Sequence, residues 1–121
     1  WSGSLQVDIW KYGKGALNQH LFKVTSRYYP KWFYYFWIKY HLPEFKMIAE
    51  SKATTMGHIQ RKDLSNAIVL VPDGQELNFI DNIMSPLIEK IEHNNAQVLV
   101  LQKLRDTLLP KLISGEIRVK I

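Results

Sequence analysis

Residues 73–121 read DGQELNFIDNIMSPLIEKIEHNNAQVLVLQKLRDTLLPKLISGEIRVKI, and this stretch decides the fold. Its central part carries side chains that recur alternately four and three positions apart, which is the spacing of a coiled-coil seam. The seam positions are Leu87, Ile91, Asn94, Val98, Leu101, Arg105 and Leu108, with Ile88 and Leu104 widening the stripe. Because a helix with such a stripe needs a partner, we expect it to pair with a second helix.

Two prolines suggest where the helices of this stretch begin and end. Ser85 is a favourable N-cap and Pro86 suits the first helical position, where a missing N–H costs nothing. We therefore expect a short helix over about 75–84 and a long one over about 86–109, roughly 35 Å in length. Pro110 should end or kink the long helix, because its ring removes a backbone donor.

The last residues, 110–121, are expected to form a tail. Gly115 is a suitable C-terminal stop for the preceding helix, and residues 117–121 alternate like a short strand. In the seam itself, Asn94 and Arg105 are polar, and such residues can specify register at a cost in stability. The alternative is that Asn94 faces solvent and the stripe packs on its own domain.

Charge divides the chain into two parts. Residues 1–73 hold ten Lys and Arg against five acids, a net charge of +5, whereas residues 74–121 hold six of each and are neutral. A polyanion should therefore meet the first part, and protein should meet the second. A merely soluble basic surface would give the same excess, so charge alone leaves both interpretations open.

The first part predicts a small mixed domain. Residues 5–10 alternate apolar and polar side chains, residues 21–24 nearly do, and residues 67–71 form an apolar run before Pro72, so all three suit strands. Residues 32–42 read as a helix after Pro30. A second short helix is expected over residues 44–51.

An aromatic cluster, WFYYFW at residues 32–37, invites a membrane or base-stacking interpretation. The run is much shorter than the roughly 20 apolar residues that a membrane span needs, and Lys31 and Lys39 bound it. We expect no membrane association. Large rings at i,i+4 spacing favour a small core, because bases within a duplex are not available for stacking.

Two polar segments are the candidate DNA contacts. One is the polar, basic segment 54–64, which follows the second expected helix. Its hydroxyl, amide and cationic groups can clamp phosphates or address base edges. The other is the turn around Gly13 and Gly15. The candidate residues are Lys11, Lys14, Asn18, Gln19, His20, Lys52, Thr54, Thr55, His58, Gln60, Arg61 and Lys62. Asn18 and Gln19 have a structural alternative, which is to tie the loop to backbone groups. For the other segment, the alternative is that Lys62-Asp63-Leu64 starts a helical turn and that Arg61 is solvated.

No catalytic constellation stands out. The four histidines have no paired helical spacing with one another or with carboxylates that would favour zinc, so no metal ligands are expected. The chain lacks cysteine, which excludes disulfides and thiolate chemistry and is compatible with a reducing compartment. A Gly-rich cofactor loop is absent as well, and we expect neither cofactor nor catalytic residues.

The order of parts from Asp73 resembles the conserved spacer region of the specificity subunit of type I restriction-modification enzymes. Residues 54–72, with Thr54, Ile59 and Asp63-Leu64 leading into a strand and Pro72, look like the loop that closes a target recognition domain there. Asn18-Gln19 resembles a pair that often follows the glycine turn in these domains, and residues 109–117 are close to the way the conserved region finishes.

In such subunits, each recognition domain reads one half of a split target in double-stranded DNA, and two antiparallel spacer helices set the gap between the halves. The resemblance implies a cytoplasmic, non-catalytic protein that assembles with modification (methyltransferase) subunits and restriction subunits. We expect an α+β fold: residues 1–73 form the C-terminal part of a recognition domain, and residues 74–121 form the spacer that pairs in an antiparallel coiled coil.

The chain opens on Trp1 without a start methionine, so we interpret it as a fragment. With one partial recognition domain and one spacer, self-association through the long helix would rebuild the helix pair. Two other classes stay open: a protein-interaction module whose basic charge is incidental, and an enzyme domain of methyltransferase type with its motifs upstream of Trp1.

Overall fold

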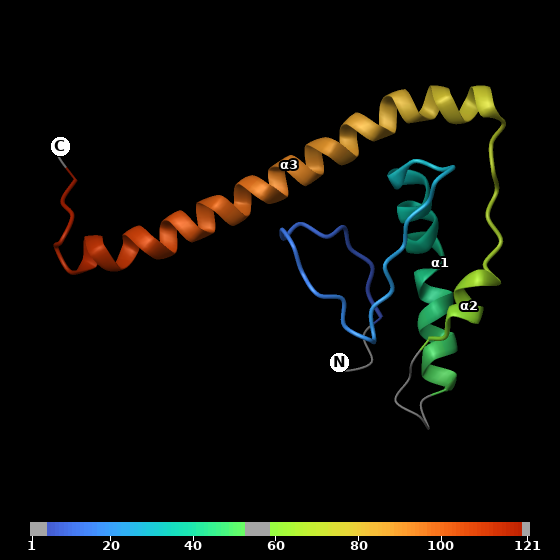
Figure 1. The fold of residues 1–121 in the computed structure, drawn as a ribbon, viewed down its shortest axis with the longest axis horizontal. Coiled ribbons are helices and arrows are strands. Elements are labelled where there is room, and N and C mark those ends of the chain that lie inside the picture. Colours follow the sequence, from blue (N-terminus) through green and yellow to red (C-terminus); the bar gives the residue numbers. More distant parts are fainter. Residues whose placement is uncertain (1–4, 53–58, 120–121) are drawn as a thin grey trace.

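The computed structural model describes residues 5–52 and 59–119, which form three helices: α1 (Lys31–Ser51), α2 (Arg61–Ser65) and α3 (Gly74–Ile113). Figure 1 shows α3 as a long rod that passes over the start of α1, with α2 beside the far part of α1. The segment before α1, drawn in blue, is an open coil. The molecule is therefore a small helical body from which one long helix projects.

The boundaries of α3 follow from its flanking residues. The carboxylate of Asp73 accepts hydrogen bonds from the backbone N–H groups of Gln75 and Glu76, at 2.9 and 2.8 Å, and so caps the helix. At the other end Gly115 adopts a left-handed φ of 75°, which is the helix stop that the sequence predicted. The 40 residues of α3 extend about 60 Å.

The expected restart at Ser85 was wrong, because α3 is continuous through both Pro86 and Pro110. Each proline leaves one carbonyl without its helical donor, four residues earlier, at Asn82 and Asp106. Both of these residues are exposed, so water can satisfy the carbonyls. The Ser85 hydroxyl donates to Asp81 instead of capping a new helix. Figure 1 shows the axis bending between the yellow and orange parts of α3.

The expected break between residues 32–42 and residues 44–51 is likewise absent. Helix α1 continues through Pro43, and the carbonyl that this proline leaves unpaired belongs to exposed Lys39. One long helix therefore connects the core at its start with α2 near its end.

The aromatic cluster does form the core, as predicted. Trp32 and Phe33 are buried together with Ile88 of α3, and Leu77, Ile80 and Met84 of α3 pack around them. Phe36, by contrast, faces outward. Three further residues are buried, Phe45 and Ala49 in the second half of α1 and Ile59 shortly before α2. The first half of α3 is thus held by α1.

The expected α+β class was wrong: residues 5–52 and 59–119 contain no strand. The alternation itself is real, since Leu5, Val7 and Ile9 are half-buried and the residues between them are exposed. Residues 67–71 begin in the same way, whereas residues 21–24 and 117–119 are exposed throughout. A strand also needs a neighbour's backbone to pair with, and no segment of the described chain supplies one.

Candidate nucleic-acid interface

Four of the predicted DNA-contacting cations are exposed: Lys11, Lys14, Arg61 and Lys62. Within the described residues none of them forms an ion pair, so their charges are available to an anionic partner. They come from two places, the turn before α1 and the first turn of α2. A duplex is a suitable partner for such cations because its phosphates form a regular array of negative charge.

The turn that carries Lys11 and Lys14 is shaped by a tryptophan. The Trp10 Nε1–H donates to the carbonyl of Gly13 at 2.8 Å, which folds the indole ring back over the turn. A Cβ atom at Gly15 would lie 2.8 Å from the Trp10 ring, so a larger residue there would require the exposed indole ring to shift. Both lysines of this turn are exposed.

The Asn18–His20 part of this turn uses its polar groups locally. The Asn18 side-chain oxygen accepts from the His20 N–H at 2.9 Å, and its backbone carbonyl accepts from the Leu21 N–H at 3.0 Å. Gln19 Nε2 lies 3.2 Å from His20 Nε2. The structural alternative for Asn18 is therefore present, since its side-chain oxygen shapes the loop.

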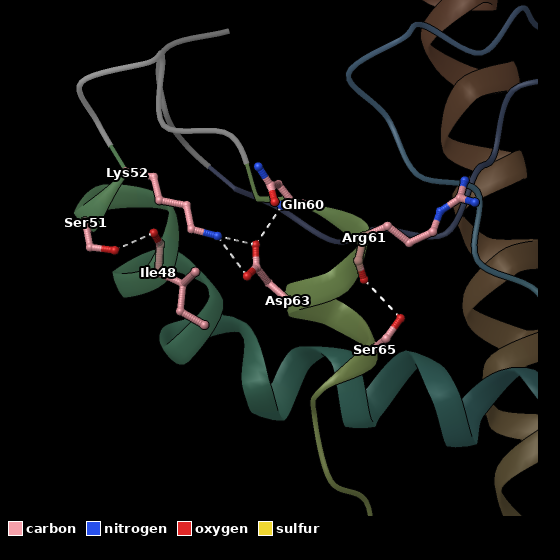
Figure 2. A network of polar contacts seen from close by, with 7 residues as sticks. All are labelled: Ile48, Ser51, Lys52, Gln60, Arg61, Asp63 and Ser65. Carbon is pink, nitrogen blue, oxygen red and sulfur yellow. Dashed lines mark hydrogen bonds and ion pairs between the residues drawn. The ribbon is translucent and has the colours of Figure 1, made fainter.

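Lys52 has a different position from the other cations. Its ammonium group lies 2.8 and 2.7 Å from the two carboxylate oxygens of Asp63, and the same carboxylate accepts from the Gln60 N–H at 2.8 Å (Figure 2). These contacts join the end of α1 to the start of α2. Lys52 thus makes a structural contact in the described chain, and its predicted contact with DNA stays a prediction.

The pKa of Asp63 is lowered by its contacts, first by the hydrogen bond from Lys52 and then by the backbone N–H of Gln60. Both contacts favour the charged carboxylate. At neutral pH Asp63 therefore stays ionised, and the link between the two helices stays closed.

Arg61 and Lys62 lie on the first turn of α2. Figure 2 shows the Arg61 side chain extending away from the Lys52–Asp63 pair. Gln60 stands just before this turn, and its side chain takes part in a capping box with Asp63. Three other predicted contacts, Thr54, Thr55 and His58, lie outside the described residues.

The helix-pairing positions are exposed along α3. Ile88 is only 4% exposed, whereas its neighbour Leu87 is 54% exposed, so the core and the seam lie on different faces of the helix. The remaining predicted seam residues are exposed too: Ile91, Asn94, Val98, Leu101, Leu104, Arg105 and Leu108. The alternative is met in part: Asn94 faces solvent and Ile88, at the edge of the stripe, packs on the chain's own core, whereas the seven seam positions are exposed.

Asp63 was expected either in a loop motif or at the start of a helical turn, and the helical turn is present as α2, but the contact that Asp63 makes with Lys52 was not predicted. The spacing of Gln60 and Asp63 is that of a capping box, in which the third helical residue bonds back to the cap. That spacing could have identified Asp63 as the carboxylate that organises this loop end.

Other kinds of site find no support in residues 5–52 and 59–119. No group of three or more histidine, aspartate or glutamate residues there could hold a metal ion. None of the described helices combines the length and apolar character that crossing a bilayer requires.

The sequence relationship that accompanies this geometry is to the specificity subunits of type I restriction enzymes. The chain is 36% identical over 89 residues to the type I restriction enzyme MjaIX specificity subunit of Methanocaldococcus jannaschii. The alignment covers 74% of this chain, and the chain spans about a fifth of that protein (20%). No protein-family model and no solved structure matches. The match confirms the resemblance found in the sequence: the chain is a relative of part of such a subunit.

Proposed function

We propose that the chain acts as the non-catalytic, DNA-reading component of a cytoplasmic type I restriction-modification system. The observation that carries this proposal is the 36% identity to a specificity subunit, over 74% of the chain. The exposed cations Lys11, Lys14, Arg61 and Lys62, none of which forms an ion pair within the described residues, support it because they offer phosphate contacts.

In this proposal residues 1–73 meet double-stranded DNA and residues 74–121 meet protein. The exposed seam of α3 pairs in an antiparallel coiled coil with a second spacer helix, supplied by another copy of the chain. The paired helices set the distance between two half-sites and form the surface on which modification and restriction subunits dock. Base readout comes from Asn18, Gln19, His20, Thr54, Thr55, His58 and Gln60.

Duplex binding at two salt concentrations tests the proposal. If cations of the first part meet phosphates, affinity falls steeply between about 50 and 200 mM salt, and R61Q/K62Q reduces the slope of log K against log salt by about 1.8. The matched control, K90Q/K103Q, removes the same charge from α3 and should leave the slope unchanged.

A protein-interaction module is the second candidate, and the exposed stripe of α3 is the observation that favours it. Such a module would show little duplex binding at either salt concentration. Equal slopes in R61Q/K62Q and K90Q/K103Q would also contradict the proposed DNA contact, because they would report only the net charge of the chain.

A further inference from the structure

The start of α1 contacts the side of α3 through two polar contacts, and an apolar contact lies between them. The Trp32 Nε1–H donates to Asp81 Oδ1 at 2.7 Å, and the Lys31 ammonium group lies 2.6 Å from Glu92 Oε1. Between these two positions on α3 lies Ile88, which is buried against Trp32. Two adjacent residues of α1 thus hold α3 at two separate points.

The spacing of these two points gives the contact its mechanical meaning. Asp81 and Glu92 are eleven positions apart, about three helical turns, so they share one face of α3 and lie roughly 16 Å apart along its axis. A single contact would let α3 pivot on the end of α1. Contacts on both sides of Ile88 oppose tilting in either direction.

The Trp32 contact is the stronger of the two points. Trp32 is buried, and its N–H would be left without a partner if the contact opened, which is costly for a buried donor. Asp81 also accepts from the Ser85 hydroxyl, and the bonds from Ser85 and Trp32 lower the pKa of Asp81. At neutral pH its carboxylate therefore remains a charged acceptor.

The Lys31–Glu92 contact is the weaker point, because both side chains are partly open to water. Its contribution to stability is accordingly small. The Lys31–Glu92 contact opposes tilting of α3 through its position, because it and the Trp32–Asp81 contact lie on opposite sides of Ile88.

We propose that Lys31 and Trp32 are positioning residues that fix the direction of α1 relative to α3, and thereby the place where the basic part of the molecule meets a duplex. This inference rests on the proposed function. Helix α1 is about 31 Å long and carries α2 at its far end. A tilt of about 10° at the joint would move Arg61 and Lys62 by roughly 5 Å, about one and a half base-pair steps.

Distances between spin labels test the joint directly in the full chain, which has no native cysteine. Labels at E50C on α1 and Q97C on α3, both exposed positions, report the angle between the helices. Dilution with unlabelled chain removes distances between copies. We expect a narrow distribution in the parent chain and at least a twofold broader one in K31Q/W32F.

Two further variants separate positioning from stability. F33L removes apolar contact from the same core but keeps both polar points, so its melting temperature should fall while its distribution stays narrow. K31Q changes only a partly exposed side chain and should fold, with a smaller broadening than the double variant. Distributions in K31Q and K31Q/W32F as narrow as in the parent would overturn the inference.

Selection from a pool of duplexes with a randomised stretch of about 30 base pairs adds the functional readout. The parent chain should enrich half-site pairs at one spacing, and K31Q/W32F should enrich pairs at several. F33L should keep the single spacing. No enrichment by the parent would contradict the proposed function. The distances between the labels would still test whether Lys31 and Trp32 fix the direction of α1 relative to α3. One unchanged spacing in K31Q/W32F would overturn its positioning role.

Discussion

A single carboxylate, Asp63, connects two elements of the candidate interface. It accepts from Lys52 after α1 and from the Gln60 N–H before α2, so it holds the beginning and the end of the connection between these helices. A phosphate that approached Lys52 would have to compete with Asp63. Of the candidate cations in the described chain, Lys11, Lys14, Arg61 and Lys62 have no such carboxylate partner.

The pH dependence of stability should report this contact. Because the pKa of Asp63 is lowered in the folded chain, its stabilising effect is complete above the ordinary aspartate value near 4 and is lost as pH falls through the lower folded value. D63N keeps an acceptor for Gln60 but removes the charge. We expect D63N to melt below the parent at pH 7, with the two converging near pH 2.

Thermal melts followed by circular dichroism between pH 2 and 7 measure this convergence. D8N is the matched control, since Asp8 is an exposed carboxylate whose side chain bonds only the next N–H in the described chain. A difference between D63N and the parent that stays constant across the pH range would show that the charge of Asp63 does not stabilise the fold.

For single residues, the sequence predicted which side chains are exposed better than it predicted which groups they contact. The exposure of Lys11, Lys14, Arg61 and Lys62 follows from their charge, because isolated cations stay in water. The roles of Asn18 and Lys52 depend on which group lies opposite each side chain. That neighbour is decided by the folded chain and not by the spacing of residues.

Among the elements, the sequence located the helical segments of α1 and α3 but not their continuity, and the expected strands are absent from the described residues. A helix satisfies its own backbone, so the four-and-three spacing along α3 was sufficient to identify the stripe and its exposed face. A strand depends on a second segment for its hydrogen bonds, and alternation in residues 5–10 says nothing about whether that segment exists. The expected breaks at the prolines were wrong because the carbonyl that each proline leaves without a donor belongs to an exposed residue, where water can replace the missing hydrogen bond.

Self-association through α3 gives the test at this scale. Leu101 is an exposed seam residue, and an apolar side chain of this kind contributes about 1.5–3 kcal/mol when it is buried. A two-fold pair contains the position twice, so L101E should weaken association at least about a hundredfold. Sedimentation of the parent and L101E over a range of concentrations measures this change.

The control for L101E is Q102E, which introduces the same charge one position off the seam. Q102E should sediment as the parent does. Since Leu101 lies in water in the single chain, both variants should keep the helical signal and melting behaviour of an isolated copy. Equal association of the parent and L101E would show that the stripe is not the pairing surface.

For the molecule as a whole, the arrangement separates the exposed cations of α2, Arg61 and Lys62, from the exposed stripe of α3. The core of Trp32, Phe33 and Ile88 lies at the joint between them, and α1 carries α2 away from α3 (Figure 1). The exposed seam begins on α3 at Leu87, beside that core, and continues beyond it. A copy can therefore pair through α3 while its cations remain open to a duplex.

This separation predicts that pairing and DNA affinity are coupled although their residues do not touch. Two paired copies place two sets of cations on one duplex, and the second set then binds at a high effective concentration, which raises affinity by about 10²–10⁴. L101E should therefore lower duplex affinity about a hundredfold and halve the salt slope, because half of the phosphate contacts are lost.

Fluorescence anisotropy with a labelled duplex at several salt concentrations measures both quantities, with Q102E as the control. A chain that binds duplex as a single copy would give the same affinity and the same slope in both variants, and pairing would then have no part in DNA recognition.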